Sequence, residues 1–139
     1  MVKKILLPVD GSQFMERNIS YACDVAMSMD AKLTLIHVVT LPTIVEPGFP
    51  IDPKPFEQDG LKTLEKAKKI AKDKEIDPET KLGKTFGNPA QEILKVAEEG
   101  KFDLIIIGAK GHSLLRNLMI GSVCDTVVHN AHCPVLVVR

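Results

Sequence analysis

Unbroken runs of aliphatic residues recur along the chain and predict buried β-strands. The clearest runs are residues 3–9, 33–39, 102–107 and 135–138, each rich in Val, Ile and Leu. Continuous apolar runs are typical of strands that are covered on both faces in a parallel sheet. A fifth run, residues 81–86, alternates more between apolar and polar positions, so we expect it at an edge of the same sheet.

Four stretches with helical spacing separate these strands, at about residues 12–29, 56–74, 89–100 and 122–130. We expect the apolar positions of these helices to pack on the sheet, among them Ile19, Met29, Leu61, Ile93 and Val128. The lysine-rich side of the second helix is expected to face solvent.

Capping signals mark the ends of several helices. Asn88 followed by Pro89 predicts the start of the third helix, and Gly100 predicts its end. Ser12 and Ser122 are expected to cap the first and fourth helices, because serine hydroxyls accept hydrogen bonds from first-turn amides.

The alternation of strands and helices predicts one α/β domain over residues 1–139: an open, twisted, five-stranded parallel sheet with helices on both faces. Such sheets bind ligands beyond the carboxyl ends of the strands, where the strand order reverses. Residues 40–55 contain five prolines and predict a long loop. Because this loop follows the carboxyl end of the second strand, it is a candidate lid; a solvent-exposed connector fits the sequence equally well.

Composition narrows the function classes. The 139 residues are 45% hydrophobic, and 18 basic residues balance 18 acidic ones. The neutral balance offers no broad positive field for nucleic acid or anionic membranes, and the longest apolar run is too short to span a bilayer. The N-terminus lacks the pattern of a signal peptide. Three cysteines without metal-ligand spacing fit a reducing compartment, so we expect a cytoplasmic protein whose cysteines are small buried apolar residues.

The chemistry concentrates after the strand that ends at Ile107. Gly108 and Gly111 follow it, and after nine further residues Gly121 and Ser122 open the fourth helix. Glycines let the backbone approach an anion, and the amides of a helix N-terminus point toward it. The pattern predicts a phosphate site that is neither a Walker loop nor a Rossmann fingerprint.

Charged side chains complete this candidate site. Lys110, His112 and Arg116 lie within the glycine loop and add local positive charge suited to phosphates, although His112 also fits a solvent-facing loop residue. Asp10 follows the first strand and is a candidate for a ribose hydroxyl or for Mg²⁺ shared with phosphate oxygens. A turn-forming or capping aspartate remains the alternative for Asp10.

The glycine spacing G-x2-G-x9-G-[ST], the opening KKILLPVDGS and the ending CPVLVVR resemble the ATP-binding branch of the universal stress protein family over the whole chain. The resemblance implies a Rossmann-like, adenine nucleotide alpha hydrolase-like sheet with strand order 3-2-1-4-5. It also implies ATP with Mg²⁺ or Mn²⁺ as the ligand, and a homodimer formed through strand 135–138. The positions that match the family's nucleotide site are Pro8, Val9, Asp10, Val38, Ile107, Gly108, Gly111, Gly121, Ser122 and Val123.

Several functions remain open at this point. The leading hypothesis is a regulatory ATP-binding dimer with an unknown protein partner and at most slow hydrolysis, because the motif supplies binding more than catalysis. An ATPase with metal on Asp10 and with Arg116 or His112 at the phosphoryl group is the enzyme alternative. A nucleotide-free interaction scaffold, or a sensor of AMP or a cyclic nucleotide, would fit as well. A flavin is disfavoured, since the chain has no Trp and only one Tyr.

Overall fold

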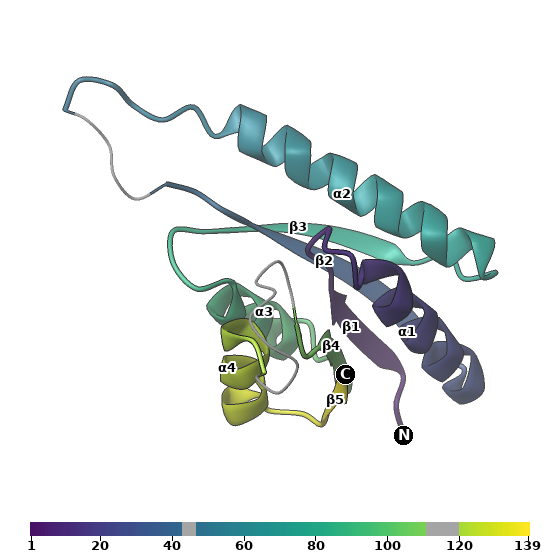
Figure 1. Cartoon of the computed structure of the whole chain (residues 1–139). Coiled ribbons are helices and arrows are strands. Elements are labelled where there is room, and N and C mark those ends of the chain that lie inside the picture. The colour runs from purple at the N-terminus through teal and green to yellow at the C-terminus, as the bar shows by residue number, and fades with distance from the viewer. Residues whose placement is uncertain (43–46, 111–119) are drawn as a thin grey trace.

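The structure is a computed structural model that describes residues 1–42, 47–110 and 120–139. Five strands alternate with four helices within this part of the chain (Figure 1). In chain order the elements are β1 (Lys4–Pro8), α1 (Met15–Met29), β2 (Lys32–Thr40), α2 (Lys54–Asp73), β3 (Glu79–Thr85), α3 (Pro89–Glu99), β4 (Leu104–Gly108), α4 (Ser122–Asn130) and β5 (Val135–Val138).

The five strands form one sheet in the order β3-β2-β1-β4-β5, and every neighbouring pair is parallel. This confirms the predicted fold class, the strand order and the edge position of β3. The strand order reverses at β1, since β2 and β4 flank it on opposite sides. The carboxyl ends of β1 and β4 therefore border the crevice in which sheets of this type bind ligands.

Alternate residues of the central strand serve two separate cores. Ile5 and Leu7 pack with α1 and α2 on one face of the sheet, whereas Leu6 packs with α3 and α4 on the other. Figure 1 shows the same division, with α2 and α1 above and to the right of the central strands and α3 and α4 at the lower left. All three side chains are fully buried. Burying each contributes about 1.5–3 kcal/mol, so β1 anchors both layers.

The helix ends confirm some capping predictions and correct others. The Asn88 side chain accepts a hydrogen bond from the Ala90 amide at 2.9 Å, so it caps α3 as predicted. Ser122 is already the first residue of α4, and the N-cap is Gly121. Ser12 does not cap α1: its hydroxyl accepts from the Phe14 amide within a turn, and the helix begins only at Met15.

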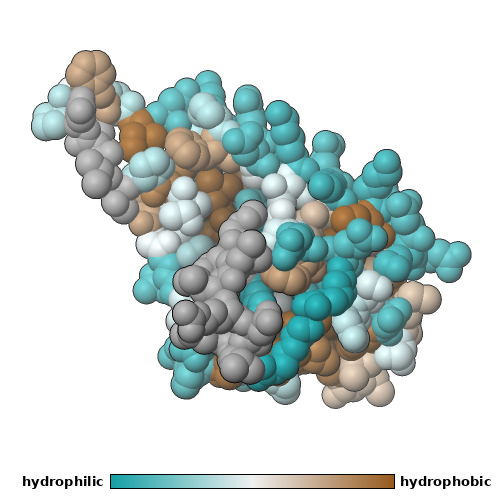
Figure 2. All heavy atoms as spheres, in the orientation of Figure 1, coloured by the Kyte–Doolittle hydropathy of each residue, from teal (hydrophilic) through white to brown (hydrophobic). Residues whose placement is uncertain are grey.

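Three apolar residues expected to face the core are instead exposed, namely Met29, Leu61 and Val128. Met29 is the last residue of α1. The buried stripe of α2 consists of small or aliphatic residues from Gly60 to Ala71, and the lysines opposite that stripe face solvent as predicted. Figure 2 shows hydrophilic side chains along this outer face.

Residues 47–53, the described part of the connection that leads into α2, extend away from the body of the molecule (Figure 1). Of these, residues 47–50 are exposed, and Phe49 retains 72% of its accessible surface. Hydrophobic surface gathers at the end of the molecule where this connection emerges (Figure 2). The candidate lid function of residues 40–55 stays a prediction.

Candidate functional site

A cavity of about 620 Å³ opens at the carboxyl ends of β1, β2 and β4. All four helices add residues to its walls, among them Asn18 of α1, Gly60 of α2, Ile93 of α3 and Ser122 of α4. A volume between about 300 and 1,000 Å³ is typical of small-molecule and cofactor sites. The cavity lies at the strand reversal, where the sequence predicted a ligand site.

Nine of the twelve candidate site residues line this cavity. They are Pro8, Val9, Asp10, Val38, Ile107, Gly108, Gly121, Ser122 and Val123. The other three candidates, Gly111, His112 and Arg116, lie outside the described residues. Segments that are more than one hundred residues apart in the sequence thus contribute to one site.

Asp10 forms a tight turn at the end of β1. Its Oδ1 accepts a hydrogen bond from the Ser12 amide at 3.0 Å, and Gly11 between them has a φ of +72°. The left-handed conformation favours glycine at position 11. Asp10 therefore has the turn role considered as the alternative, while its side chain also lines the cavity.

The start of α4 supplies amides for an anion. Gly121 offers no side-chain cap, and its own amide donates to the Ala109 carbonyl at 2.7 Å. The first hydrogen bond within the helix runs from the Asp125 amide to the Gly121 carbonyl. The amides of Ser122, Val123 and Cys124 therefore have no partner within the helix. A helix N-terminus in this state attracts phosphates and carboxylates.

Gly121 also lets the loop close tightly on the strand end. A Cβ atom at this position would lie 3.3 Å from the Ala109 carbonyl oxygen, which is closer than most Cβ contacts in proteins. The glycine therefore allows the helix start to approach the backbone after β4. A branched side chain here would project into the cavity that Gly121 lines.

His37 was not among the sequence candidates, although it stands next to Val38. Its Nδ1 donates to the Val9 carbonyl at 2.7 Å, and the ring lines the cavity. The bond joins the carboxyl ends of β2 and β1. The signal was present in the sequence as a polar ring within an aliphatic strand whose one other interior polar residue is Thr34.

Asn18 is a second residue that sequence reasoning missed. It lies in α1, is 6% exposed, and borders the cavity beside Gly108. Met15, Asn18, Ala22 and Ala26 form the buried stripe of the helix at three- and four-residue spacing. The available signal was a carboxamide in an otherwise apolar stripe.

The wall formed by α2 could not be inferred from motifs. Phe56, Asp59, Gly60 and Thr63 reach the cavity because the first half of α2 packs against β2 and β3. Asp59 adds a second carboxylate to the site besides Asp10. Lys110, noted above as a loop cation, also borders the cavity.

Two carboxylates that could share a metal with a ligand line the cavity. Among residues 1–42, 47–110 and 120–139, no three His, Cys, Asp or Glu side chains gather closely enough to hold a metal ion. Mg²⁺ bound to nucleotide phosphates takes only one or two protein carboxylates and otherwise uses phosphate oxygens and water. Asp10 and Asp59 fit that limited role.

Cys124 is the one thiol in the described cavity wall, and it is 2% exposed. Burial raises the pKa of this thiol above its ordinary value, with a smaller contribution from the Asp125 carboxylate. The group stays protonated at neutral pH. It therefore acts as a small apolar residue, as the sequence predicted for the cysteines.

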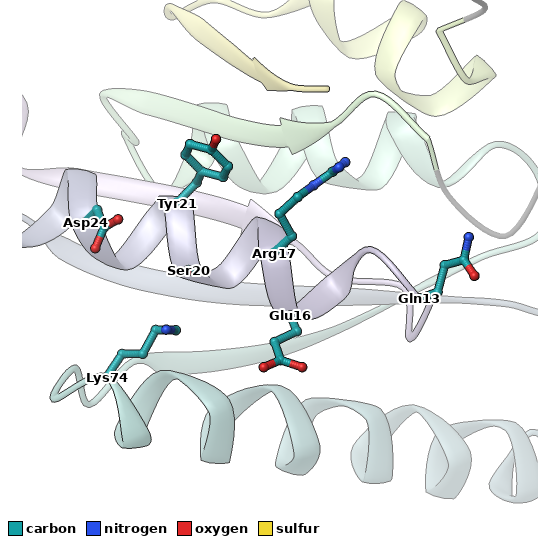
Figure 3. Close-up of a pocket in the computed structure, with 7 residues that line it drawn as sticks. All are labelled: Gln13, Glu16, Arg17, Ser20, Tyr21, Asp24 and Lys74. Carbon is teal, nitrogen blue, oxygen red and sulfur yellow. The ribbon is translucent and has the colours of Figure 1, made fainter. Parts of the chain in front are cut away.

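A second hollow, of about 660 Å³, lies on the outer side of α1 (Figure 3). Its residues carry charges of both signs, from Glu16, Arg17, Asp24 and Lys74. Figure 3 shows Glu16 pointing toward α2, whereas Arg17 and Tyr21 point to the other side of α1. The side chains do not converge on a common point, so we assign no site to this surface.

Comparison with known proteins settles the family. The sequence profile described as the Universal stress protein family matches residues 1–139. The chain belongs to the universal stress protein family. It is 35% identical over 143 residues to universal stress protein MJ0531 of Methanocaldococcus jannaschii, covering 100% of this chain and 83% of that one. It is also 35% identical over 150 residues to YxiE of Bacillus subtilis, with 100% of both chains covered.

Solved structures of the family share the fold. A universal stress protein from Archaeoglobus fulgidus superimposes with a TM-score of 0.80 at 21% identity, with 100% of both chains covered. A structure of the A. fulgidus protein in complex with dAMP gives 0.73 at 23% identity, again over 100% of both chains. A universal stress protein in complex with cAMP gives 0.75 at 23% identity, covering 99% of this chain and 97% of the other.

The lengths and hydropathy of the described helices bear on whether they could span a membrane. None of the helices in residues 1–42, 47–110 and 120–139 is long and apolar enough to cross a bilayer. This agrees with the short apolar runs in the sequence.

Proposed function

We propose that this universal stress protein binds an adenine nucleotide, ATP with Mg²⁺ or Mn²⁺, in the cavity at the carboxyl ends of β1, β2 and β4. The observation that carries the proposal is the convergence of nine motif and strand-end residues on one cavity of about 620 Å³. The dAMP and cAMP complexes of related proteins support an adenine nucleotide as the ligand class.

The two ends of the cavity suit the two ends of a nucleotide. Val38, Val39 and Phe56 provide apolar surface for the base near the end of β2. At the other end, the first-turn amides of α4 and the Ser122 hydroxyl bind the phosphates. Ile107 and Gly108 lie between these ends and flank the sugar.

The charged residues complete the assignment. Asp10, positioned by its turn to Ser12, binds the sugar or holds the metal together with phosphate oxygens. A bound divalent cation would neutralise part of the phosphate charge. Gly111 is assigned to the phosphates through the sequence motif, and His112 and Arg116 through the positive charge that they add to the glycine loop.

We propose a regulatory role rather than efficient catalysis. Hydrolysis needs a positioned water and a group that stabilises the transferring phosphoryl, and the motif supplies mainly binding. The ATPase alternative is tested by Arg116→Ala: a catalytic role requires turnover to fall more than nucleotide affinity. Equal losses of both would leave Arg116 as a binding residue.

We also propose that the protein forms a homodimer through β5. This strand, Val-Leu-Val-Val, lies at the edge of the sheet, and Leu136 keeps 36% of its accessible surface. The opposite edge, β3, carries Glu79, Lys81 and Lys84, and charges of this kind protect an edge against pairing. An apolar edge without charges is suited to pairing with its symmetry mate.

Calorimetric titration with ATP and Mg²⁺ tests the nucleotide proposal. The informative variant is Gly121→Val, whose side chain projects into the cavity and toward the Ala109 carbonyl. Gly87→Val is the matched control, since no atom lies within 4 Å of a Cβ at that position. We expect binding by the wild type and by Gly87→Val, and none by Gly121→Val.

The other outcomes decide between the alternatives. Tighter binding of AMP or a cyclic nucleotide than of ATP would replace ATP as the ligand but keep the site. Equal binding by both glycine variants would place the ligand elsewhere. No binding of any adenine nucleotide would overturn the proposal and favour the interaction scaffold.

A further inference from the structure

Asn18 is a buried polar side chain whose acceptor lacks a partner. It is 6% exposed, and its Oδ1 is inaccessible and makes no hydrogen bond within the described part of the chain. Its backbone amide is satisfied, since it donates to the Phe14 carbonyl at 3.0 Å. A buried acceptor left unpaired destabilises a fold, and native proteins rarely keep one without a functional reason.

The side chain lies against the strand end that begins the glycine loop. A Cβ atom on Gly108 would lie 2.3 Å from Nδ2 of Asn18 and 3.2 Å from its Cγ. Glycine at position 108 therefore makes room for the carboxamide. This is a reason for Gly108 that does not involve phosphate.

Asn18 also borders the cavity between its apolar and its anion-binding ends. The residue it touches, Gly108, directly precedes the segment that leads to the α4 N-terminus. The base-sized apolar surface lies farther along the sheet, at Val38 and Val39 of β2. The part of a nucleotide that comes next to Asn18 is therefore the sugar, which connects base and phosphate.

The chemistry of the carboxamide agrees with this position. Oδ1 can only accept a hydrogen bond, and phosphate oxygens cannot donate one because they are deprotonated above their pKa values. A sugar hydroxyl both donates and accepts, so it can accept from Nδ2 as the carboxamide stands, or donate to Oδ1 after a half-turn about χ2 brings that buried oxygen to the cavity side. We propose that Asn18 is a specificity-determining residue that hydrogen-bonds a ribose hydroxyl and so distinguishes ribonucleotides from deoxynucleotides. The inference rests on the proposed nucleotide site.

The test compares ATP with its 2′-deoxy and 3′-deoxy analogues on the full chain. Affinities are measured for the wild type, Asn18→Ala and the control Ser20→Ala, which changes a polar residue of α1 on the outer hollow. We expect the wild type and Ser20→Ala to bind ATP roughly three- to tenfold more tightly than one of the deoxy analogues. Asn18→Ala should bind ATP and that analogue equally.

Thermal unfolding without nucleotide gives a second readout. Because Asn18→Ala removes an unpaired buried acceptor, we expect its Tm to equal or exceed that of the wild type. A purely structural role for Asn18 predicts the opposite pattern: a lower Tm and equal loss of affinity for all three nucleotides.

The failure of this inference is distinguishable from the failure of the proposed function. A wild type that binds ATP and both deoxy analogues equally overturns the role of Asn18 but keeps the nucleotide site. A wild type that binds none of the three overturns both.

Discussion

The imidazole of His37 donates from Nδ1 to the backbone carbonyl of Val9 across 2.7 Å. Val9 in turn donates its amide to the Ile36 carbonyl at 2.8 Å. Two hydrogen bonds therefore join the carboxyl ends of β1 and β2 where they border the cavity. The floor of the site is fixed by a side chain that has no place in the glycine motif.

Replacing this histidine tests the link between the two strand ends. We expect His37→Ala to lower the free energy of unfolding by about 1–3 kcal/mol, because the part-buried Val9 carbonyl loses its donor. Urea denaturation measures the change. His132→Ala, at an exposed loop position, is the control and should leave stability within about 0.5 kcal/mol. Equal effects of the two variants would contradict the linking role of His37.

Gly60 permits the close packing of α2 on the sheet. A Cβ atom there would lie 2.7 Å from Cγ2 of Val39 and 2.8 Å from Cδ1 of Leu82. Although alanine is normally better in a helix by about 1 kcal/mol, we expect Gly60→Ala to destabilise the protein by about 1–3 kcal/mol through overpacking. Denaturant titration checks this, with Gly87→Ala as the unhindered control. A gain in stability for Gly60→Ala would contradict the observed packing.

The Asp103 carboxyl should make the folding stability of the protein depend on pH in the acid range. Hydrogen bonds from the Lys3 and Lys4 amides, at 2.8 and 2.9 Å, hold the pKa of this carboxyl below its ordinary value. Because the pKa of this carboxyl is lower in the folded state than its value of about 3.9 in the unfolded state, the carboxylate stabilises the fold at pH values above about 3.9. This stabilisation is lost as the pH falls through the folded-state pKa. The wild type should therefore be more stable than Asp103→Asn at neutral pH, and the difference should vanish in strong acid.

Unfolding curves at several pH values measure that difference. Asp77→Asn is the control, because its ion pair with Lys72 spans 3.9 Å and is largely exposed. A stability difference between the wild type and Asp103→Asn that does not change with pH would show that the carboxylate charge contributes nothing.

The proposed dimer makes a prediction about β5. Leu136→Lys places a charge at the apolar edge and should convert a dimer into a monomer, because like charges would meet across a symmetric strand pair. Analytical ultracentrifugation of the wild type and the variant measures the change. Glu79→Lys on β3 is the control: it places the same side chain on the edge that already carries charges and should leave the oligomeric state unaltered. A monomeric wild type would contradict the proposal.

Much of the fold was predictable because local patterns and global architecture agree. The aliphatic runs of β1 and β4 are buried on both faces, and such runs indicate a parallel sheet wherever they occur. Gly108 and Gly121 reach one cavity because both lie at the same edge of the sheet. Asn88 caps α3, as the local sequence Asn88-Pro89 predicted.

The remaining features depend on contacts that no local pattern encodes. The first helix begins at Met15 because consecutive side-chain turns, from Asp10 to Ser12 and from Ser12 to Phe14, occupy the preceding residues. The α2 wall of the cavity results from where the helix packs against β2 and β3. The fit of Asn18 against Gly108 joins residues ninety positions apart, so only the folded chain reveals it.

The central claim is that the cavity holds an adenine nucleotide, and the nucleotide content of the freshly purified protein tests it most directly. The wild type and Gly121→Val are denatured, and the released small molecules are separated by ion-exchange chromatography. We predict that ATP is recovered from the wild type and that no nucleotide is recovered from Gly121→Val. Absence of nucleotide from the wild type, together with failure to bind added ATP and Mg²⁺, would contradict the claim and leave the glycine motif with a structural role.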